Sequence, residues 1–385
     1  MRAWLAIAIL TTLGGMMLGG MTFGGPAAAQ TYKSSAGPLA VTTVADRLEH
    51  PWALAFLPDG RMLVTERPGR MRIVDRDGHL SEPLSGVPRV FAVGQGGLLD
   101  VALDRNFAQN KTIYFCFAEP ATQGETSGGR TAMARATLGN GRLDDVNVIF
   151  HQEGPLSNGG HFGCRIAQGA DGNLFLTMGE HFISRDEAQK LTSDLGKIVR
   201  IRPDGSAPPD NPFVGRADAR PEIWSYGHRN VQGAAIHPVS GKLWTHEHGA
   251  RGGDEVNIPQ AGKNYGWPVI SYGVNYDGTP VGSGKSKMPG MEQPIKYWVP
   301  SIAPSGMAFY QGNLFPAWKG SLFVGALAAR LLVRLSLRDE RVTGEERLLQ
   351  PLHERIRDVR NGPDGALYLL TDNDAGRILR VSPAK

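Results

Sequence analysis

The chain has 385 residues, a formal net charge of +4, and abundant glycine and proline, with 50 and 26 residues respectively. The positive excess is small and no basic run concentrates it, which argues against a nucleic-acid partner. No long helical periodicity is present, so the sequence disfavours a mainly helical fold.

Residues 1–29 have the pattern of a secretory signal. Arg2 precedes a long uncharged apolar stretch that ends in three alanines at positions 27–29. A charged start, an apolar middle and small residues at the end are typical of a cleaved leader. An uncleaved membrane anchor is the alternative, but glycines interrupt the apolar run. No later segment approaches the roughly 18 apolar residues that span a bilayer. We therefore expect cleavage near Ala29 and a periplasmic or secreted mature chain with no integral membrane segment.

One pattern recurs six times after this leader. A short apolar strand is followed by a turn of the Pro-Asp-Gly type, a second apolar strand and, in several copies, Gly-Arg and a third strand. The first copy is WALAFLPDGRMLVTERPGRMRIV at residues 52–74, and the last is RDVRNGPDGALYLLTDNDAGRILRV at residues 357–381. The intervening copies begin at residues 96, 164, 233 and 305.

These copies predict the fold. Asp-Gly and Ser-Gly supply the positive φ of a tight hairpin turn. Hairpins this short are stable only when neighbouring units cover them. We expect an all-β protein, a six-bladed β-propeller of four-stranded antiparallel blades that forms one catalytic domain over residues 30–385. A β-sandwich with repeated hairpins is the alternative.

The sequence does not decide whether the two cysteines are bonded to each other. Cys116 and Cys164 are the only ones in the chain. Export permits a disulfide between them, but two buried thiols fit their positions equally well.

His161 is the first candidate functional residue. It stands in the stretch LSNGGHFGCR, with glycines at positions 159, 160 and 163. This stretch opens a blade, and the entry of each innermost strand of a propeller lies around the central channel. We expect His161 at the channel mouth, where the glycines would admit a ligand. A histidine there would be a base that works near neutral pH.

Further polar residues occupy other blade-entry loops. Arginines from different blades that converge on one channel would form an anion site. Asp254 and Glu255 are either oxygen ligands for calcium or a bracing salt bridge. A base, a cation and anion-binding arginines together suit oxidation of an alcohol by a bound anionic cofactor. The entry-loop residues are Gln95, His228, Arg229, Asn230, Gln232, Glu247, Arg251, Asp254, Glu255, Arg355, Arg357 and Asp358.

Several of these stretches resemble a known family. QGGLLD, NGGH, GKIVRI, SYGHRNVQG, EHGARGGDEVN, KNYGWP and RIRDVRNGPDG are similar to motifs of the soluble aldose sugar dehydrogenases that use pyrroloquinoline quinone, the glucose/sorbosone dehydrogenase family. The resemblance runs from about residue 51 to residue 383, in the order of the family.

The resemblance implies a six-bladed propeller with the quinone in a cleft at its top and an aldose as the substrate. It implies that His161 takes the proton from the anomeric hydroxyl while hydride passes from C1 to the quinone, that Gln95, Arg229 and Asn230 line the site, and that Arg355 and Arg357 hold the cofactor. The electron acceptor is not identified.

The resemblance also implies two calcium ions. One lies on the cofactor and is held by the backbone carbonyls of Gly249 and Ala250. The second is structural and uses the positions of Glu255 and Tyr265.

Three positions depart from the family pattern. Where the family has Gly-Asp-Gln, this chain has Gly-Glu-His, with Glu180 and His181, so an acid is kept on a longer side chain. Ala250 replaces a proline, and a carbonyl ligand survives that change. Ala328 replaces a lysine that contacts the cofactor. We expect weaker cofactor binding as a result, with Arg330 on the same strand face supplying part of the missing contact.

Two other functions remain open from the sequence. A calcium-dependent lactonase on a similar propeller would hydrolyse a sugar lactone without the quinone. A non-catalytic propeller that has lost its cofactor would bind carbohydrate or protein, and Ala328 is the feature that favours it.

Overall fold

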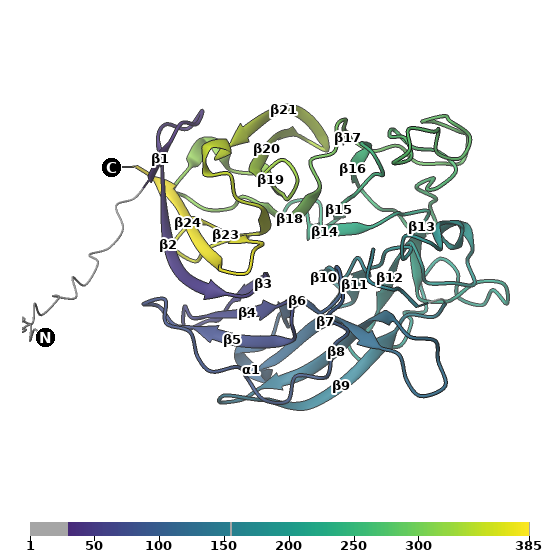
Figure 1. Ribbon diagram of the computed structural model, residues 1–385, viewed down its shortest axis with the longest axis horizontal. Helices are drawn as coiled ribbons and strands as arrows, with labels where there is room; N and C mark the ends of the chain where they lie inside the picture. Colours follow the sequence, from purple (N-terminus) through teal and green to yellow (C-terminus); the bar gives the residue numbers. More distant parts are fainter. Residues whose placement is uncertain (1–29, 155, 385) are drawn as a thin grey trace, which may run out of the picture.

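The computed structural model describes residues 30–154 and 156–384, so the predicted signal at residues 1–29 lies outside the described residues. Six antiparallel sheets follow one another around a central axis (Figure 1). The predicted six-bladed β-propeller is therefore confirmed. Within the described ranges, no helix has the length and apolar character needed to cross a membrane.

The blades follow the six sequence copies. The first contains β3 (Pro51–Phe56), β4 (Met62–Glu66) and β5 (Arg70–Val74), with a bridge from Val74 to Leu80 at its outer edge. The next four blades each have four strands. The second blade has β6 (Leu98–Leu103), β7 (Thr112–Pro120), β8 (Gly129–Leu138) and β9 (Leu143–His151), and the third has β10 (Ile166–Gln168), β11 (Leu174–Thr177), β12 (Lys197–Ile201) and β13 (Ile223–Tyr226). The fourth blade has β14 (Val231–Ile236), β15 (Leu243–Glu247), β16 (Asp254–Asn257) and β17 (Lys296–Trp298), and the fifth has β18 (Pro304–Phe309), β19 (Leu322–Ala326), β20 (Leu331–Arg338) and β21 (Arg341–Leu348).

Both ends of the described chain build the sixth blade. It contains β22 (Ile356–Asn361), β23 (Leu367–Thr371) and β24 (Gly376–Pro383), and its outer strands are β2 (Leu39–Leu48) and β1 (Gln30–Tyr32). β2 pairs with β24 over most of its length, with Val41 opposite Val381. Figure 1 shows purple β2 lying against yellow β24. The ring is thus closed within the sixth blade, by backbone hydrogen bonds between β2, near the start of the described chain, and β24, at its end. This closure leaves few open sheet edges.

The turns behave as their residues predict. Gly60 and Gly365, in the first and last Pro-Asp-Gly copies, have φ of 85° and 80°, a conformation that favours glycine. Helical structure is short in the described ranges: α1 (Phe107–Asn110) and the 3-10 turns η1 (Arg185–Gln189), η2 (Pro316–Trp318) and η3 (Gln350–Leu352).

Apolar strand faces pack between neighbouring blades. The largest cluster joins the first three blades around Phe115, Phe117 and Leu176, and a second joins the fifth and sixth blades around Trp318 and Phe323. These side chains are fully buried or nearly so, and burial at about 25 cal/mol per Å² of apolar surface holds the ring together.

A buried ion network fills the axis. Arg165 lies 3.1 Å from a carboxylate oxygen of Asp100 and 3.1 Å from one of Asp358. Arg360 pairs with the same two acids at 3.0 and 2.7 Å. The Arg165 guanidinium also lies 4.1 Å from the centre of the Trp52 ring. Side chains from four blades therefore meet on the axis and separate its two mouths.

The two cysteines form a disulfide. Cys116 of β7 and Cys164, just before β10, are bonded with a Cα–Cα distance of 5.7 Å. Both are fully buried. The bond ties the second blade to the loop that carries His161.

Candidate functional site

The entries of the innermost strands meet at one mouth of the axis. A cavity of about 400 Å³ there is lined from five of these entries by Trp52, Gln95, Gln232, Ala303 and Arg357. The other ends of the same strands line a cavity of about 420 Å³ at the opposite mouth, with Phe56, Leu103, Ile236 and Phe309. Four of the predicted site residues line this first mouth directly: Gln95, Gln232, Arg355 and Arg357.

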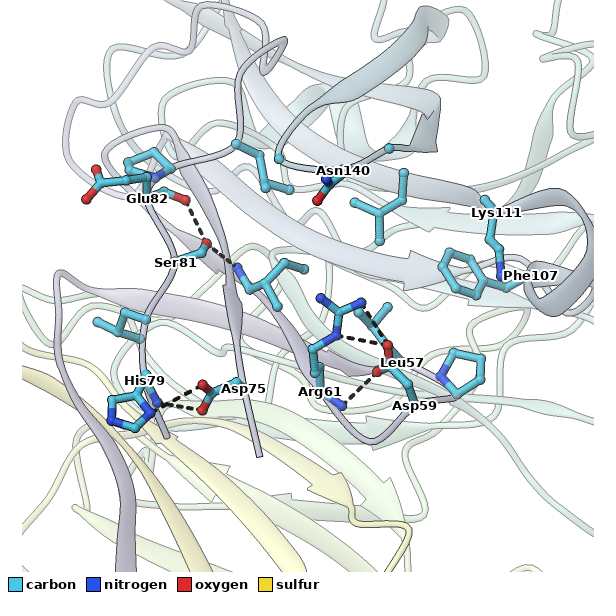
Figure 2. Close-up of a pocket in the computed structure, with 18 residues that line it drawn as sticks. Leu57, Asp59, Arg61, Asp75, His79, Ser81, Glu82, Phe107, Lys111 and Asn140 are labelled. Atoms are coloured by element: carbon cyan, nitrogen blue, oxygen red, sulfur yellow. Dashed lines mark hydrogen bonds and ion pairs between the residues drawn. The ribbon is translucent and has the colours of Figure 1, made fainter. Parts of the chain in front are cut away.

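A larger cavity, of about 740 Å³, lies on the flank between the first two blades (Figure 2). Four of its polar side chains are already paired with one another. Arg61 donates to Asp59, and His79 Nδ1 lies 3.2 Å from Asp75. None of the predicted site residues lines it, so the axial mouth is the candidate active site.

His161 is held in one orientation. Its Nδ1 lies 2.8 Å from Glu180 Oε2, and its main-chain N–H donates to Gln95 Oε1 at 3.0 Å. The residue is 4% exposed. Burial lowers the pKa of His161 below its usual value, although the Glu180 hydrogen bond acts in the opposite direction. A neutral imidazole with Nδ1–H directed at a carboxylate has its Nε2 lone pair available to take a proton.

Glu180 is ionised at neutral pH. Burial is the largest single influence and would raise its pKa, but the hydrogen bond and charge of His161, the Arg229 charge and the Phe182 N–H together lower it. The longer acid of the Gly-Glu-His sequence thus contacts His161 directly.

The glycines around His161 do not all clear space for a ligand. Gly163 has φ of 65°, and a Cβ there would lie 2.6 Å from the Met178 backbone. Residue 163 is a glycine because its backbone crosses the Met178 backbone too closely for a side chain. Gly160 is more open, since a Cβ there would meet only Phe182, at 3.6 Å.

Arg355 and Arg357 converge on the axial cavity, as predicted for an anion site. Asp372 Oδ2 lies 2.9 Å from Arg355 and 3.4 Å from Arg357. Burial would raise the Asp372 pKa, but the Arg357 charge and the Arg355 hydrogen bond hold it well below its usual range. Two cations share this one carboxylate, which leaves a surplus of positive charge at the cavity wall.

Three buried donors at this mouth have no acceptor among the described residues: Arg229 Nε, Asn230 Nδ2 and Arg357 Nε. Buried donors are nearly always paired in folded proteins. Asn230 Oδ1 accepts from Gly163 N at 3.1 Å and from Gln232 at 3.3 Å, which fixes the amide with its nitrogen unpaired. A ligand rich in acceptor oxygens would satisfy these groups.

Two glutamates stand opposite each other beside this mouth. Glu247 of β15 is the direct cross-strand partner of Glu255 of β16, and like charges in that position repel. Burial, followed by the Glu247 charge, raises the pKa of Glu255 to about 8. A cavity of about 10 Å³ touches both glutamates and Tyr265, which is room for one water or ion. Paired carboxylates beside such a space fit a calcium ion.

Tyr265 lies beside this cavity with its side chain engaged elsewhere. Its hydroxyl donates to Ile258 O at 2.8 Å, and its ring stacks on His228 at 4.8 Å between centroids. The phenol is thus already engaged.

The Gly249–Ala250 turn contacts Arg229. The Arg229 guanidinium donates to Gly249 O and, at 3.3 Å, to His248 O. A calcium ion on the Gly249 carbonyl would therefore share that oxygen with Arg229 or displace it. Asp254 braces this turn by accepting from Gly249 N at 2.9 Å and Ile302 N at 2.7 Å. Asp254 thus braces the loop through hydrogen bonds from backbone amides, and it forms no salt bridge among the described residues.

The expectation for Arg330 is wrong. Ala328 and Arg330 lie in the turn at residues 327–330 between β19 and β20, and both are exposed. Arg330 has φ of 52°. Residues in a tight turn do not alternate as strand residues do, so the shared strand face does not exist. Leu327, next to Ala328, lines the axial cavity.

Sequence reasoning missed Asp372, His50 and Phe182. His50 binds Asp372 at 3.0 Å and lines the axial cavity; it precedes β3, so the blade-entry rule applied to the first blade would have found it. Asp372 follows β23, the second strand of its blade. A hairpin brings the end of its second strand back beside the start of its first strand. Residues at the ends of the second strands are therefore also site candidates, and this rule would have identified Asp372.

Comparisons with known proteins agree with this geometry. The family model described as Glucose / Sorbosone dehydrogenase matches residues 48–380. Aldose sugar dehydrogenase YliI of Escherichia coli (strain K12) is 47% identical over 345 residues, which cover 89% of this chain and 92% of that protein. A solved glucose dehydrogenase structure has 51% identity and a TM-score of 0.87, covering 89% of this chain and 99% of its own. The PQQ-bound form of aldose sugar dehydrogenase from Streptomyces coelicolor has 30% identity and a TM-score of 0.73, covering 89% of this chain and 98% of its own.

Proposed function

Since the chain belongs to the glucose/sorbosone dehydrogenase family, we propose that it is a periplasmic or secreted enzyme that oxidises aldose sugars at C1 to lactones. Pyrroloquinoline quinone and Ca²⁺ would be its cofactors. The observation that carries this proposal is the juxtaposition of a neutral, carboxylate-held His161 with unpaired buried donors at one mouth of the axis.

The donors fit an anionic quinone. Arg355 and Arg357 present cationic groups to the axial cavity, and Gln95 adds a neutral one. Guanidinium groups bind carboxylates with two parallel hydrogen bonds. Arg229 and Asn230 add the unpaired Nε and Nδ2 groups. Bound here, pyrroloquinoline quinone would supply the hydride acceptor.

His161 would act as the general base. The Glu180 carboxylate fixes the tautomer with the proton on Nδ1 and stabilises the imidazolium that forms when Nε2 takes the anomeric proton. Arg229 lies close enough for its charge to act on both His161 and Glu180, so it would favour the negative charge that develops on the sugar oxygen.

Calcium would act at two places. Near the cofactor, the carbonyls of Gly249 and Ala250 are the proposed ligands. Beside it, Glu255 and Tyr265 would hold a structural ion that relieves the repulsion between Glu247 and Glu255.

Reconstitution tests the proposal. Protein purified without the quinone should reduce a redox dye in the presence of aldose only after both quinone and Ca²⁺ are added. His161→Ala should lose about 10²–10⁴-fold in turnover and still bind the quinone, because positioned acid–base catalysis contributes that much.

The contrary outcomes identify the alternatives. Lactone hydrolysis with calcium alone would make the protein a lactonase. Neither activity, with sugar binding retained, would make it a non-catalytic propeller.

A further inference from the structure

Two exposed aromatic side chains stand beside the buried base. Phe182 and Tyr276 are 50% and 60% exposed. Their rings stack with centroids 6.0 Å apart and an interplanar angle of 28°. The Phe182 ring also meets the His161 ring edge-on, with centroids 5.1 Å apart. The order from the base outward is therefore His161, Phe182, Tyr276.

Phe182 is held in place at a cost to the backbone. Phe182 and the preceding His181 have φ of 64° and 60°, a left-handed conformation that residues with a Cβ seldom adopt. The Phe182 N–H donates to Glu180 Oε2 at 2.5 Å. That same oxygen binds His161 Nδ1, so one carboxylate fixes both the base and the aromatic ring.

Tyr276 is fixed from the other side. Its hydroxyl accepts from Arg229 Nη2 at 3.3 Å. Its loop is anchored by paired backbone hydrogen bonds between Arg251 and Val274, at 2.8 and 3.3 Å. Arg185 donates to Asn275 at 3.4 Å and links the Phe182 segment to the Tyr276 segment. Two distant parts of the chain therefore present one continuous aromatic surface.

Without a ligand, the exposed stack of Phe182 and Tyr276 adds little to the stability of the fold. Strain at Phe182 would ordinarily be offset by burying the ring, yet half of the residue is exposed. A strained, exposed aromatic side chain next to a catalytic base is typical of a ligand-binding surface.

The chemistry of the surface selects its ligand. An anion would not stack on the phenyl ring, because the face of an aromatic ring carries negative charge. A wholly apolar ligand would leave the polar groups of His161 and Arg229 unsatisfied. A pyranose has C–H groups on its faces and hydroxyls around its edge, and it matches both.

We infer that Phe182 and Tyr276 form a sugar-stacking wall: Phe182 packs against the ring that is oxidised, and Tyr276 packs against the next ring of a reducing disaccharide. The inference rests on the proposed function, since it is the anomeric hydroxyl at His161 that brings the sugar beside Phe182. Phe182 would therefore affect KM for every aldose, whereas Tyr276 would matter most for a substrate with a second ring.

Side-chain replacements test the wall. Phe182→Ala and Phe182→Leu should raise KM for D-glucose about three- to tenfold and change kcat by less than about twofold, since an aromatic contact contributes that much to binding. Phe182→Tyr keeps the ring and should retain the wild-type KM. Tyr276→Ala should raise KM for maltose more than for glucose. Val239→Ala is the control, because Val239 is an exposed apolar residue in the turn after β14, at the opposite end of its blade.

A second readout needs neither quinone nor turnover. Methyl β-D-glucoside has a blocked anomeric hydroxyl and is not oxidised at C1. Saturation of aromatic protons in the protein without quinone should transfer to its ring protons in the wild type and in Phe182→Tyr, and should be lost in Phe182→Leu.

The outcomes separate the two proposals. If the wild type oxidises aldoses but every variant keeps wild-type KM and saturation transfer, the wall is overturned and the proposed function stands. If no aldose is oxidised but transfer depends on the ring at position 182, the wall stands and the proposed function fails. Loss of transfer in Phe182→Tyr together with Phe182→Leu would overturn the wall, because the backbone rather than the ring would then be responsible.

Discussion

The Glu180 carboxylate holds the His161 imidazole, with Oε2 2.8 Å from Nδ1. Burial lowers the His161 pKa, and the Glu180 hydrogen bond acts against that shift. The pair therefore sets both the orientation and the basicity of the proposed base.

Glu180→Gln tests that role. The amide keeps the size of the side chain and removes its charge, so turnover should fall by about 10- to 100-fold, part of what acid–base catalysis contributes. Because the carboxylate raises the His161 pKa, its loss should also move the acid limb of the kcat/KM profile to lower pH. An unchanged limb would show that Glu180 does not act through His161.

The pH profile of the wild type is itself predictable. Burial places the His161 pKa below its usual value of 6.5, so the imidazole is neutral at pH 7. With the proposed function, kcat/KM should be level near neutrality and should decline as the pH falls below that lowered pKa, because a protonated imidazole takes no proton. Steady-state rates between about pH 4 and pH 8, a range that brackets the unperturbed histidine value of about 6.5, would check this. A limb centred above 6.5 would contradict it.

The axial network should matter for stability. Arg165→Met leaves Asp100 and Asp358 with Arg360 as their remaining cation. Breaking a buried pair of this kind costs about 3–5 kcal/mol, since a buried charge loses its partner. Urea unfolding would measure the loss. Arg216→Met is the matched control, because the Arg216–Asp218 pair is exposed, and it should leave the unfolding midpoint unchanged.

The disulfide should stabilise the fold. Replacing Cys116 and Cys164 together by alanine should lower the free energy of unfolding by about 2–4 kcal/mol, because the unfolded chain is no longer cross-linked. A reducing agent should lower the melting temperature of the wild type and leave that of the double variant unchanged. Equal sensitivity of both proteins would show that the bond is not formed in solution.

Ala328→Lys should tighten quinone binding. The residue adjoins Leu327 at the cavity wall, and one charge-assisted hydrogen bond contributes roughly 1.5–3 kcal/mol, or about one to two decades in Kd. Fluorescence titration would measure it. Because Arg330 is exposed in the turn, Arg330→Ala should leave Kd unchanged, and a weaker Kd in that variant would place the arginine at the cofactor after all.

The repeat pattern predicts much of the site for a simple reason. Six copies imply a ring, and a ring brings residues such as Gln95, His161 and Arg357 to one mouth although they are distant in sequence. Local residue pattern does not reveal which partner each one takes. Asp372 reaches the site through the return of a hairpin, and the chain turns at residues 327–330, where strand periodicity would place Ala328 and Arg330 on one strand face.

The sequence contains no pattern that would have placed Phe182 at the site. A phenylalanine is ordinarily expected in the core, and only the structure shows that this ring is half exposed beside the base.

The pairing of β2 with β24 has a consequence for how the protein is made. β2 is synthesised before the strands of the other five blades, and its partner β24 is the last described strand, so the edge of β2 that pairs with β24 must wait for the rest of the chain. Contacts so distant in sequence form slowly, because loop closure must precede them. Ring closure should therefore be the last event in folding. Until then, the facing edges of β2 and β24 are open to pairing with other chains.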